Sequence, residues 1–308
     1  MKTSFYSHGK LLLTAEYLVL DGVNALAIPT KKGQWLIIEE CEGNQITWQS
    51  LDNEGNCWFK TNLTPDGITF QQAEGSTDKN DIENTLINIL TCAKELNPDF
   101  LTKQNGYKIE SRLEFNRQWG LGSSSTLINN IAQWAKVDAF TLLEKSFGGS
   151  GYDIACAQHD SPILYKRNEG KPVVTIANFN PSFKESLFFI YLNQKQDSKA
   201  SIKHYQSLPL KHFDQAEAAV NEITSKIVNC STLAEFTALI DLHEEVISKI
   251  IKTPTVKSRL FQDYKGSIKS LGGWGGDFIL VTGSTSEMSY FKEKGYLTII
   301  PYSKMILD

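Results

Sequence analysis

Hydrophobic residues recur at helical spacing in one stretch near the middle of the chain, NRQWGLGSSSTLINNIAQWA. Leu127, Ile131 and Ala135 repeat every four residues, which places them on one face of a helix. The residues immediately before this pattern are glycines and residues that carry hydroxyl groups. The pattern therefore predicts a tight loop that runs directly into the N-terminus of a helix.

Elsewhere the hydrophobic pattern follows the periods of strands and helices. Apolar runs on either side of Asp21 and Gly22 predict a hairpin or two adjacent strands across residues 9–28. Further strands are predicted at residues 34–40, 45–50, 56–60, 68–72, 107–115, 185–192 and 296–302, and directly after the glycine run LGGWGGD. Helices are predicted at residues 82–96, 211–228, 232–251, 256–270 and 285–294.

The composition changes near residue 183, where a segment that contains Pro181 is followed by the fresh apolar run ESLFFIYL. A domain boundary is predicted there, which gives domains 1–182 and 183–308. In the second domain a strand, helices, a strand, a helix and a strand follow one another with few parallel crossovers. This order indicates an α+β sandwich.

Composition and charge narrow the class of protein. The chain has 308 residues, of which 41% are hydrophobic and 21% charged, as in soluble globular proteins. Its net charge of −4 gives no general attraction to nucleic acid or to an acidic membrane. The five cysteines are widely spaced without a CxxC pair, which argues against a disulfide framework or a zinc site and favours the cytoplasm. The N-terminal apolar run is broken by polar residues, so neither a signal peptide nor a membrane span is expected.

The central loop has the chemistry of an anion site. Gly120 and Gly122 permit close backbone approach, and the first N–H groups of a helix have no partner inside it. Those donors suit a phosphate, and Ser123, Ser124 and Ser125 add hydroxyl groups that could also bind Mg²⁺. An ordinary helix N-cap is the alternative that this local sequence leaves open.

Two other places carry charged residues in unusual surroundings. Lys10 and Glu16 interrupt a buried pattern, so they are expected to pair or to face a cleft, unless both lie at strand ends in water. Asp153 follows a dense run of glycines in FGGSGYDIA, where it suits general base or electrostatic work. It could equally cap a helix that begins at Ile154.

These features stand in a characteristic order: Lys10 near the start, GLGSSST before a helix, GSGYDIA, and LGGWGGD near the end. The order resembles the GHMP superfamily of small-molecule kinases, which includes galactokinase, homoserine kinase, mevalonate kinase and phosphomevalonate kinase. GSGYDIA is most similar to the mevalonate and phosphomevalonate kinase branch. The resemblance implies a two-domain α+β fold, with a left-handed βαβ unit around the phosphate loop and a ferredoxin-like α/β sandwich at the C-terminal end.

Carried over position by position, the resemblance implies roles for individual residues. The ATP phosphate cradle corresponds to Gly120, Leu121, Gly122, Ser123, Ser124 and Ser125. Lys10 and Asp153 match the catalytic lysine and the acid that faces the acceptor. Ser124 matches a Mg²⁺-binding serine, and Glu144 lies near a metal-binding acid of mevalonate kinases, with an exposed helix glutamate as the alternative. Substrate-binding positions correspond to Glu16, Ser150, Gly151, Gly272, Gly273 and Gly275.

The chain departs from the family pattern in the first and third motifs. It has SHGK where the family usually begins APGK, and Trp274 where a small residue is common. Trp274 is expected to narrow or reshape the cleft beside the acceptor. The departures affect the identity of the substrate more than the binding of ATP.

The resulting hypothesis is an ATP- and Mg²⁺-dependent kinase for a small acidic metabolite, with mevalonate or phosphomevalonate as the acceptor and isoprenoid precursor synthesis as its setting. Two alternatives stay open: a catalytically weak nucleotide- or metabolite-binding protein on the same fold, and an enzyme like the mevalonate diphosphate decarboxylases. The expected partner is a small molecule, without nucleic acid or membrane, and a homodimer is one option for assembly.

Overall fold

The computed structural model describes residues 1–67, 69–72, 81–102, 105–196, 198–208, 214–274 and 276–307. The chain forms two compact units that interleave along the sequence. The first unit comprises residues Met1–Gly9, Lys32–Arg117 and Leu121–Gln158, and the second comprises Lys10–Lys31, Gln118–Gly120 and His159–Asp308. Strands β1 (Lys2–Leu12) and β2 (Ala25–Cys41) each begin in one unit and end in the other.

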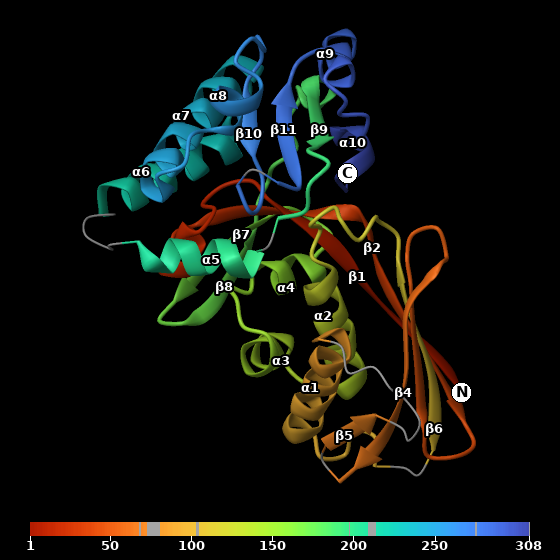
Figure 1. Cartoon of the computed structure of the whole chain (residues 1–308). Coiled ribbons are helices and arrows are strands. Elements are labelled where there is room, and N and C mark those ends of the chain that lie inside the picture. The colour runs from red at the N-terminus through yellow and green to blue at the C-terminus, as the bar shows by residue number, and fades with distance from the viewer. Residues whose placement is uncertain are drawn as a thin grey trace. The chain divides into compact units, whose positions relative to one another are not determined.

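The first unit contains a mixed sheet with the order β5-β4-β3-β6-β2 (Figure 1). Its other strands are β3 (Ile46–Leu51), β4 (Cys57–Asp66), β5 (Thr69–Gln72) and β6 (Gly106–Leu113). β3 and β6 run parallel, whereas β2 and β6, β3 and β4, and β4 and β5 are antiparallel. The helices are α1 (Asp81–Leu96), α2 (Ser123–Ala135), α3 (Ala139–Ser146) and α4 (Tyr152–Ala157).

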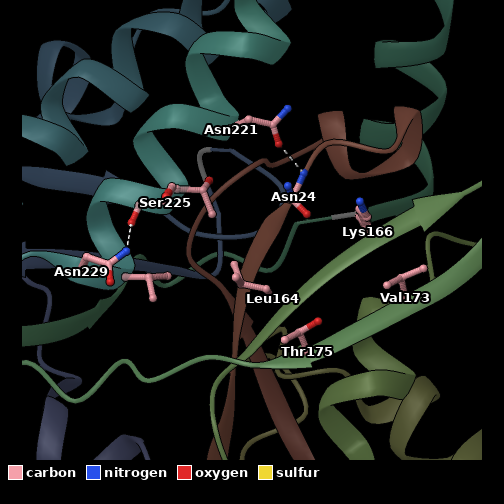
Figure 2. A pocket seen from close by; sticks show the side chains of 10 residues that line it. Asn24, Leu164, Lys166, Val173, Thr175, Asn221, Ser225 and Asn229 are labelled. Atoms are coloured by element: carbon pink, nitrogen blue, oxygen red, sulfur yellow. Dashed lines mark hydrogen bonds between the residues drawn. The ribbon is translucent and has the colours of Figure 1, made fainter.

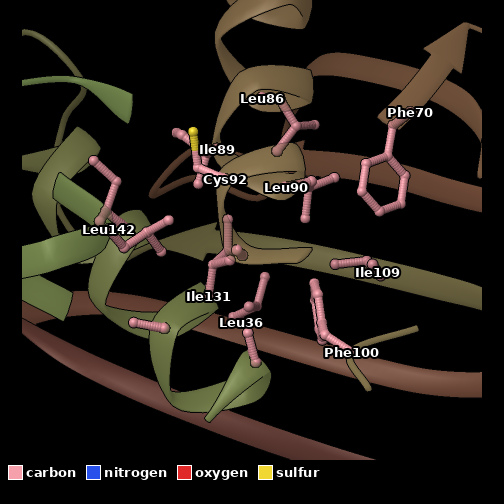
Figure 3. Packing of buried hydrophobic residues seen from close by; sticks show 14 of the residues in the cluster. Leu36, Phe70, Leu86, Ile89, Leu90, Cys92, Phe100, Ile109, Ile131 and Leu142 are labelled. Carbon is pink, nitrogen blue, oxygen red and sulfur yellow. The ribbon is translucent and has the colours of Figure 1, made fainter. Parts of the chain in front are cut away.

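The core of the first unit lies between this sheet and its helices. Leu36 and Ile109 of the sheet face Leu86 and Leu90 of α1 and Ile131 of α2 (Figure 3). All five side chains are buried, and burying a side chain of this size stabilises the fold by roughly 1.5–3 kcal/mol. This shared core fixes the direction in which α2 begins, and therefore the position of the loop before it.

Among the described residues, the second unit contains an antiparallel part of the eight-stranded sheet, to which the strands above also belong, and a separate four-stranded antiparallel sheet. In the first, the first part of β2 pairs with β7 (Ile163–Asn168), which pairs with β8 (Lys171–Ile176). The other has the order β10-β11-β9-β12, built from β9 (Leu187–Tyr191), β10 (Ile268–Ser270), β11 (Phe278–Thr282) and β12 (Ile299–Pro301). Its helices are α5 (Ser198–Ser207), α6 (Asp214–Asn229), α7 (Leu233–Ile251), α8 (Val256–Leu260), α9 (Ser289–Glu293) and α10 (Tyr302–Met305). Helices α7 and α8 pack against β10 (Figure 1).

Most of the predicted elements are present, and one prediction needs correction. Of the two options for residues 9–28, two adjacent strands are confirmed, because β1 pairs with β2 and a 3₁₀ turn at Leu18–Asp21 lies between them. Residues 256–270 do not form one helix, because α8 ends at Leu260 and the chain turns into β10. Close pairing with β11 explains this turn, since a Cβ on Gly266 would lie 2.0 Å from the Thr282 carbonyl oxygen.

The predicted class of the fold is confirmed as α+β. The β7–β8 hairpin and helix α5 were not predicted from the sequence. The predicted domain boundary at residue 183 lies inside the second compact unit and stays a prediction.

Candidate functional site

The start of α2 in the first unit is built to expose backbone donors. Gly122 occupies the N-cap position in the left-handed region, at φ 86°, and no side chain caps the helix. The ordinary side-chain N-cap that the sequence left open is therefore absent at α2. Ser123 and Ser124 are the first two helical residues, while Ser125 is buried. The N–H groups of the first turn have no partner within the helix, which suits a phosphate.

Helix α4 begins in the same way. Gly151 is its N-cap, at φ 91°, and no side chain caps it. Asp153 is the second residue of the helix, so it is not the cap that was considered as an alternative. Helix α4 packs against α2, and the Gln158 side-chain amide donates to Asn129 Oδ1 at 3.1 Å. Both glycine-led helix starts are therefore held by one set of packed helices.

The remaining predicted residues of the first unit differ in exposure. The side chain of Leu121 is fully buried, which leaves only its backbone for a ligand. Ser150 is also buried, at 8% exposure. Glu144 is exposed in the last turn of α3. This placement agrees with the alternative given for it, an ordinary exposed helix glutamate. Its role as a metal ligand stays a prediction.

In the second unit, Lys10 and the first glycine of the loop come together. Lys10 lies on β1 and is 9% exposed, which excludes the alternative of a strand end in water. Its Nζ donates to the Gly120 carbonyl oxygen at 3.0 Å. Gly120 has φ 64°, a conformation that glycine adopts without strain. Lys10 therefore holds the Gly120 carbonyl of the loop, and the positive charge of the lysine lies beside the loop.

Asp277 lies on the other side of Gly120. A Cβ built on Gly120 would come within 2.4 Å of the Asp277 carboxylate, so glycine is required for this approach. The Asp277 Oδ1 accepts the Gln196 N–H at 3.1 Å. Burial raises the pKa of Asp277, while the Gln196 hydrogen bond and the charges of Lys10 and Lys195 oppose the rise. A buried carboxylate thus faces the lysine and the loop.

The late glycine run forms a close-packed loop against the segment that follows β9. A Cβ on Gly273 would lie 2.3 Å from Cγ of Gln196, and one on Gly276 would lie 3.0 Å from its Cβ. Gly272 has φ 71°, while Gly275 lies outside the described residues. Trp274 is 5% exposed, and its indole N–H faces the Pro254 carbonyl at 3.4 Å.

Glu16 belongs to a buried cluster of charged residues rather than to the pair with Lys10 that the sequence suggested. Its Oε1 accepts a hydrogen bond from Lys269 Nζ, which also donates to Glu244 Oε1 at 3.0 Å. Burial raises the pKa of Glu16 to about 7, and Lys269 opposes the rise. Burial and Lys269 lower the pKa of His243, whose Nε2 accepts the Ala15 N–H at 3.0 Å.

Two residues of this region were missed from the sequence. Asp277 directly follows the glycine run, and an acid between glycines and a buried strand was a usable signal. Lys269 carried a weaker signal, because a lysine at the edge of an apolar run is more often exposed. Its pairing with Glu16 spans 253 residues, which no local pattern reveals.

Comparison with known proteins gives a match in structure but not in sequence. No family model matches the sequence, and no curated protein sequence matches it. A crystal structure of a mevalonate kinase superposes with a TM-score of 0.70, at 16% identity over 96% of each chain. The Streptococcus pneumoniae phosphomevalonate kinase in complex with phosphomevalonate and AMPPNP gives 0.68, at 13% identity, covering 96% of this chain and 99% of that one.

Galactokinase from Lactococcus lactis, complexed with galactose, gives a TM-score of 0.67 at 11% identity, covering 95% of this chain and 88% of that one. All these proteins are GHMP kinases, so the predicted fold resemblance is confirmed: the chain has the GHMP kinase fold. In the part of the chain that the structure describes, no helix is both long enough and apolar enough to cross a membrane.

Proposed function

We propose that this protein is an ATP- and Mg²⁺-dependent kinase that transfers a phosphoryl group to a small acidic metabolite. The observation that carries the proposal is the start of α2, a helix of 13 residues that follows a left-handed glycine without a side-chain cap. In a chain with the fold of small-molecule kinases, this geometry favours nucleotide phosphates as the bound anion. The N–H groups of Ser123, Ser124 and Ser125 are the donors that we assign to those phosphates.

Lys10 is the residue to which we assign charge stabilisation. Phosphoryl transfer depends on positioning and on neutralising negative charge more than on covalent chemistry with the protein. The Lys10 ammonium is held by the Gly120 carbonyl, so its position does not depend on a flexible side chain in water. A charge fixed in advance does not have to reorganise during the reaction.

Asp153 is assigned to the acceptor. In the reaction the bond between the terminal phosphorus of ATP and its bridging oxygen breaks, and a bond from the acceptor oxygen to that phosphorus forms. A hydroxyl acceptor also loses a proton, which Asp153 accepts in this proposal. A phosphate acceptor that is already ionised loses none, and Asp153 then only orients it.

Asp277 enters the proposal as a positioning residue. It does not need to touch the substrate, because its carboxylate lies against Gly120 and interacts electrostatically with Lys10. Its negative charge attracts the Lys10 ammonium, and its close contact holds Gly120 in place. Loss of this negative charge should therefore shift the Lys10 side chain but leave the lysine's own charge intact.

The magnesium site requires a separate argument. The described residues contain no group of three His, Cys, Asp or Glu side chains that could hold a metal by themselves. Mg²⁺ in nucleotide sites usually takes only one or two protein ligands, because waters and phosphate oxygens supply the rest. We therefore propose Ser124 and Glu144 as the protein ligands of a metal of this kind, which would neutralise phosphate charge when bound.

The acceptor is proposed from the structural neighbours. One neighbour is the L. major mevalonate kinase in complex with R-mevalonate, and another was solved with phosphomevalonate. Mevalonate and phosphomevalonate are therefore the first acceptors that we propose for this chain. Glu16, Ser150, Gly151, Gly272, Gly273 and Gly275 remain the proposed substrate-binding positions.

The test is to incubate the purified protein with ATP and Mg²⁺ and measure ADP formed with mevalonate, phosphomevalonate, galactose and homoserine. We expect ADP formation to depend on mevalonate or phosphomevalonate. Turnover with another acceptor would contradict the assigned substrate but would still support the kinase activity. Nucleotide-dependent thermal stabilisation without any transfer would support a binding protein instead, and release of CO₂ would support a decarboxylase.

A further inference from the structure

A cavity lies wholly within the second unit, among residues to which no role has been assigned. It has a volume of about 360 Å³, within the range of small-molecule sites. Its walls are the β7–β8 hairpin, one face of α6, and Asn24 just before β2 (Figure 2). None of the residues proposed above for nucleotide or acceptor lines it.

Strand register explains which side chains of the hairpin reach the cavity. Leu164 lies opposite Thr175, and Lys166 lies opposite Val173. Residues two apart on a strand share a face, so these four side chains point to the same side of the hairpin. Figure 2 shows Leu164, Thr175, Val173 and Lys166 along this one wall.

The facing stripe of α6 is mostly polar. Its cavity residues are Asn221, Thr224, Ser225, Val228 and Asn229, spaced as one face of a helix. The apolar residues that hold α6 in place, Val220, Ile223 and Ile227, lie beside this stripe, and Ser225 and Asn229 are exposed. The stripe therefore presents polar groups to the cavity.

The polar groups of the cavity are partly fixed and partly free. The Asn24 backbone N–H donates to Asn221 Oδ1 at 2.9 Å, and the Asn229 amide donates to the Ser225 carbonyl at 2.8 Å. These bonds hold the rim. Among the described residues, the side-chain ammonium of Lys166 has no ion-pair or hydrogen-bond partner. Within the same residues, the side-chain hydroxyl groups of Ser225 and Thr175 have none either.

The charge of the cavity decides the class of ligand. No acidic residue is among the described residues that line it, and Lys166 is its single cation. An ammonium group with neighbouring hydroxyl and amide donors complements a carboxylate or a phosphate. Leu164, Val173 and Val228 supply an apolar wall for a short carbon skeleton.

We propose that the cavity between the β7–β8 hairpin and α6 is a second ligand site, which binds a small organic anion through Lys166, Ser225 and Thr175. The anionic group is a carboxylate or a phosphate monoester, because both satisfy the same donors. This inference is independent of the proposed kinase activity, since it uses none of the nucleotide or acceptor residues.

The experiment follows the side-chain amide signals of Asn24, Asn221 and Asn229 by NMR, using protein saturated with AMPPNP and Mg²⁺ so that anions do not report on the nucleotide site. Glutarate, glycerol 3-phosphate and uncharged glycerol are titrated separately to about 10 mM, ten times the concentration that half-fills a 1 mM site. We expect shifts with glutarate, with glycerol 3-phosphate, or with both, and the stronger probe identifies the anionic group.

Two variants and one control complete the test. Lys166→Gln should weaken anion binding by about 10- to 100-fold, the loss expected for a hydrogen bond to a charged group. Ser225→Leu fills the cavity from an exposed helix position and should abolish the shifts. Lys226→Gln removes a neighbouring charge that is already paired with Glu222 and should leave binding unchanged.

Three results would overturn the proposal. The first is no shift of the asparagine signals with either anion. The second is an equal response to glycerol, which would indicate a polyol site without charge selection. The third is unchanged binding in Lys166→Gln, which would show that the anion does not use the lysine.

Discussion

The start of α2 and the cluster around Lys269 use polar groups in opposite ways. The cluster is fully buried, and Lys269 donates to Glu16, to Glu244 and to the Ser270 carbonyl. The start of α2 has no capping side chain, and Ser124 is exposed. Lys269 is paired inside the fold, although Glu16 Oε2 and His243 Nδ1 of the same cluster have no hydrogen-bond partner among the described residues, whereas the backbone donors at the start of α2 are left available for a ligand. Four predictions test this contrast.

The largest effect is expected in the buried cluster. Lys269→Met leaves two buried carboxylates without their cation, which should lower the free energy of unfolding by about 3–5 kcal/mol. Urea unfolding followed by circular dichroism measures this change. Lys226→Met, which removes a solvent-exposed partner of Glu222, is the matched control and should change little. Equal losses of unfolding free energy in Lys269→Met and Lys226→Met would show that the buried lysine stabilises the fold no more than an exposed one.

The next effect concerns Lys10, whose Nζ donates to the Gly120 carbonyl oxygen. Lys10→Met keeps the length of the side chain but removes its charge. We expect kcat to fall by about 10²–10³-fold, the range found when a group that stabilises transition-state charge is lost. Steady-state ADP formation measures this value.

Lys31→Met is the control for Lys10, because Lys31 also donates to a backbone carbonyl, that of Ser303, at 2.9 Å. It should keep its activity. If Lys10→Met retained full turnover, Lys10 would be a structural lysine and the catalytic assignment would be wrong.

The third prediction concerns pH. The pKa of Glu16 is raised by burial from 4.5 to about 7 in the folded protein. The folded state therefore binds this proton more tightly than the unfolded chain, so the contribution to stability is complete below about pH 4.5 and is lost as the pH rises through about 7. Lys269, Glu244 and a neutral His243 face the group.

Compared with Glu16→Gln, the wild-type protein should lose on the order of 3 kcal/mol of unfolding free energy across this pH range. Chemical denaturation at several pH values measures the difference. Parallel curves for the two proteins would show that Glu16 does not change its protonation there.

The smallest effect is expected at Asp277. Asp277→Asn keeps an oxygen for the Gln196 N–H but removes the charge that faces Lys10. We expect kcat to fall about tenfold, equivalent to about 1.4 kcal/mol, while KM for ATP changes little. Asp263→Asn, at an exposed position, is the control.

A purely structural role for Asp277 would lower the folded fraction and the urea midpoint instead. The measurement therefore combines kcat, KM and a denaturation curve for each protein. A fall in activity that follows the loss of folded protein would contradict a positioning role.

The sequence was informative wherever one local pattern carried the signal. The period of Leu127, Ile131 and Ala135 was enough to predict α2, and the glycines before it predicted a tight loop at its start, although they did not decide whether a side chain caps the helix. Contacts between distant segments were not predictable. Lys269 and Glu16 lie 253 positions apart, and the turn that ends α8 depends on the approach of Gly266 to Thr282.

The β7–β8 hairpin was missed for a related reason. Three residues of β8, Val173, Thr175 and Ile176, are exposed, so this strand has no continuous apolar face that the sequence could reveal. Strand β8 is defined more by its pairing with β7 than by its own composition. Two of these exposed residues, Val173 and Thr175, also line the cavity between the hairpin and α6, so the exposure that hid the hairpin from the sequence also opens it to a ligand.

The close approach of Gly273 to Gln196 has a consequence for the evolution of this chain. A Cβ at position 273 would meet Cγ of Gln196 at 2.3 Å and its Cβ at 2.9 Å. The two positions, 77 residues apart in the sequence, are therefore not free to vary independently. Among homologous sequences, a residue larger than glycine at position 273 should coincide with a smaller residue at position 196, a covariation that reports contact without any structure.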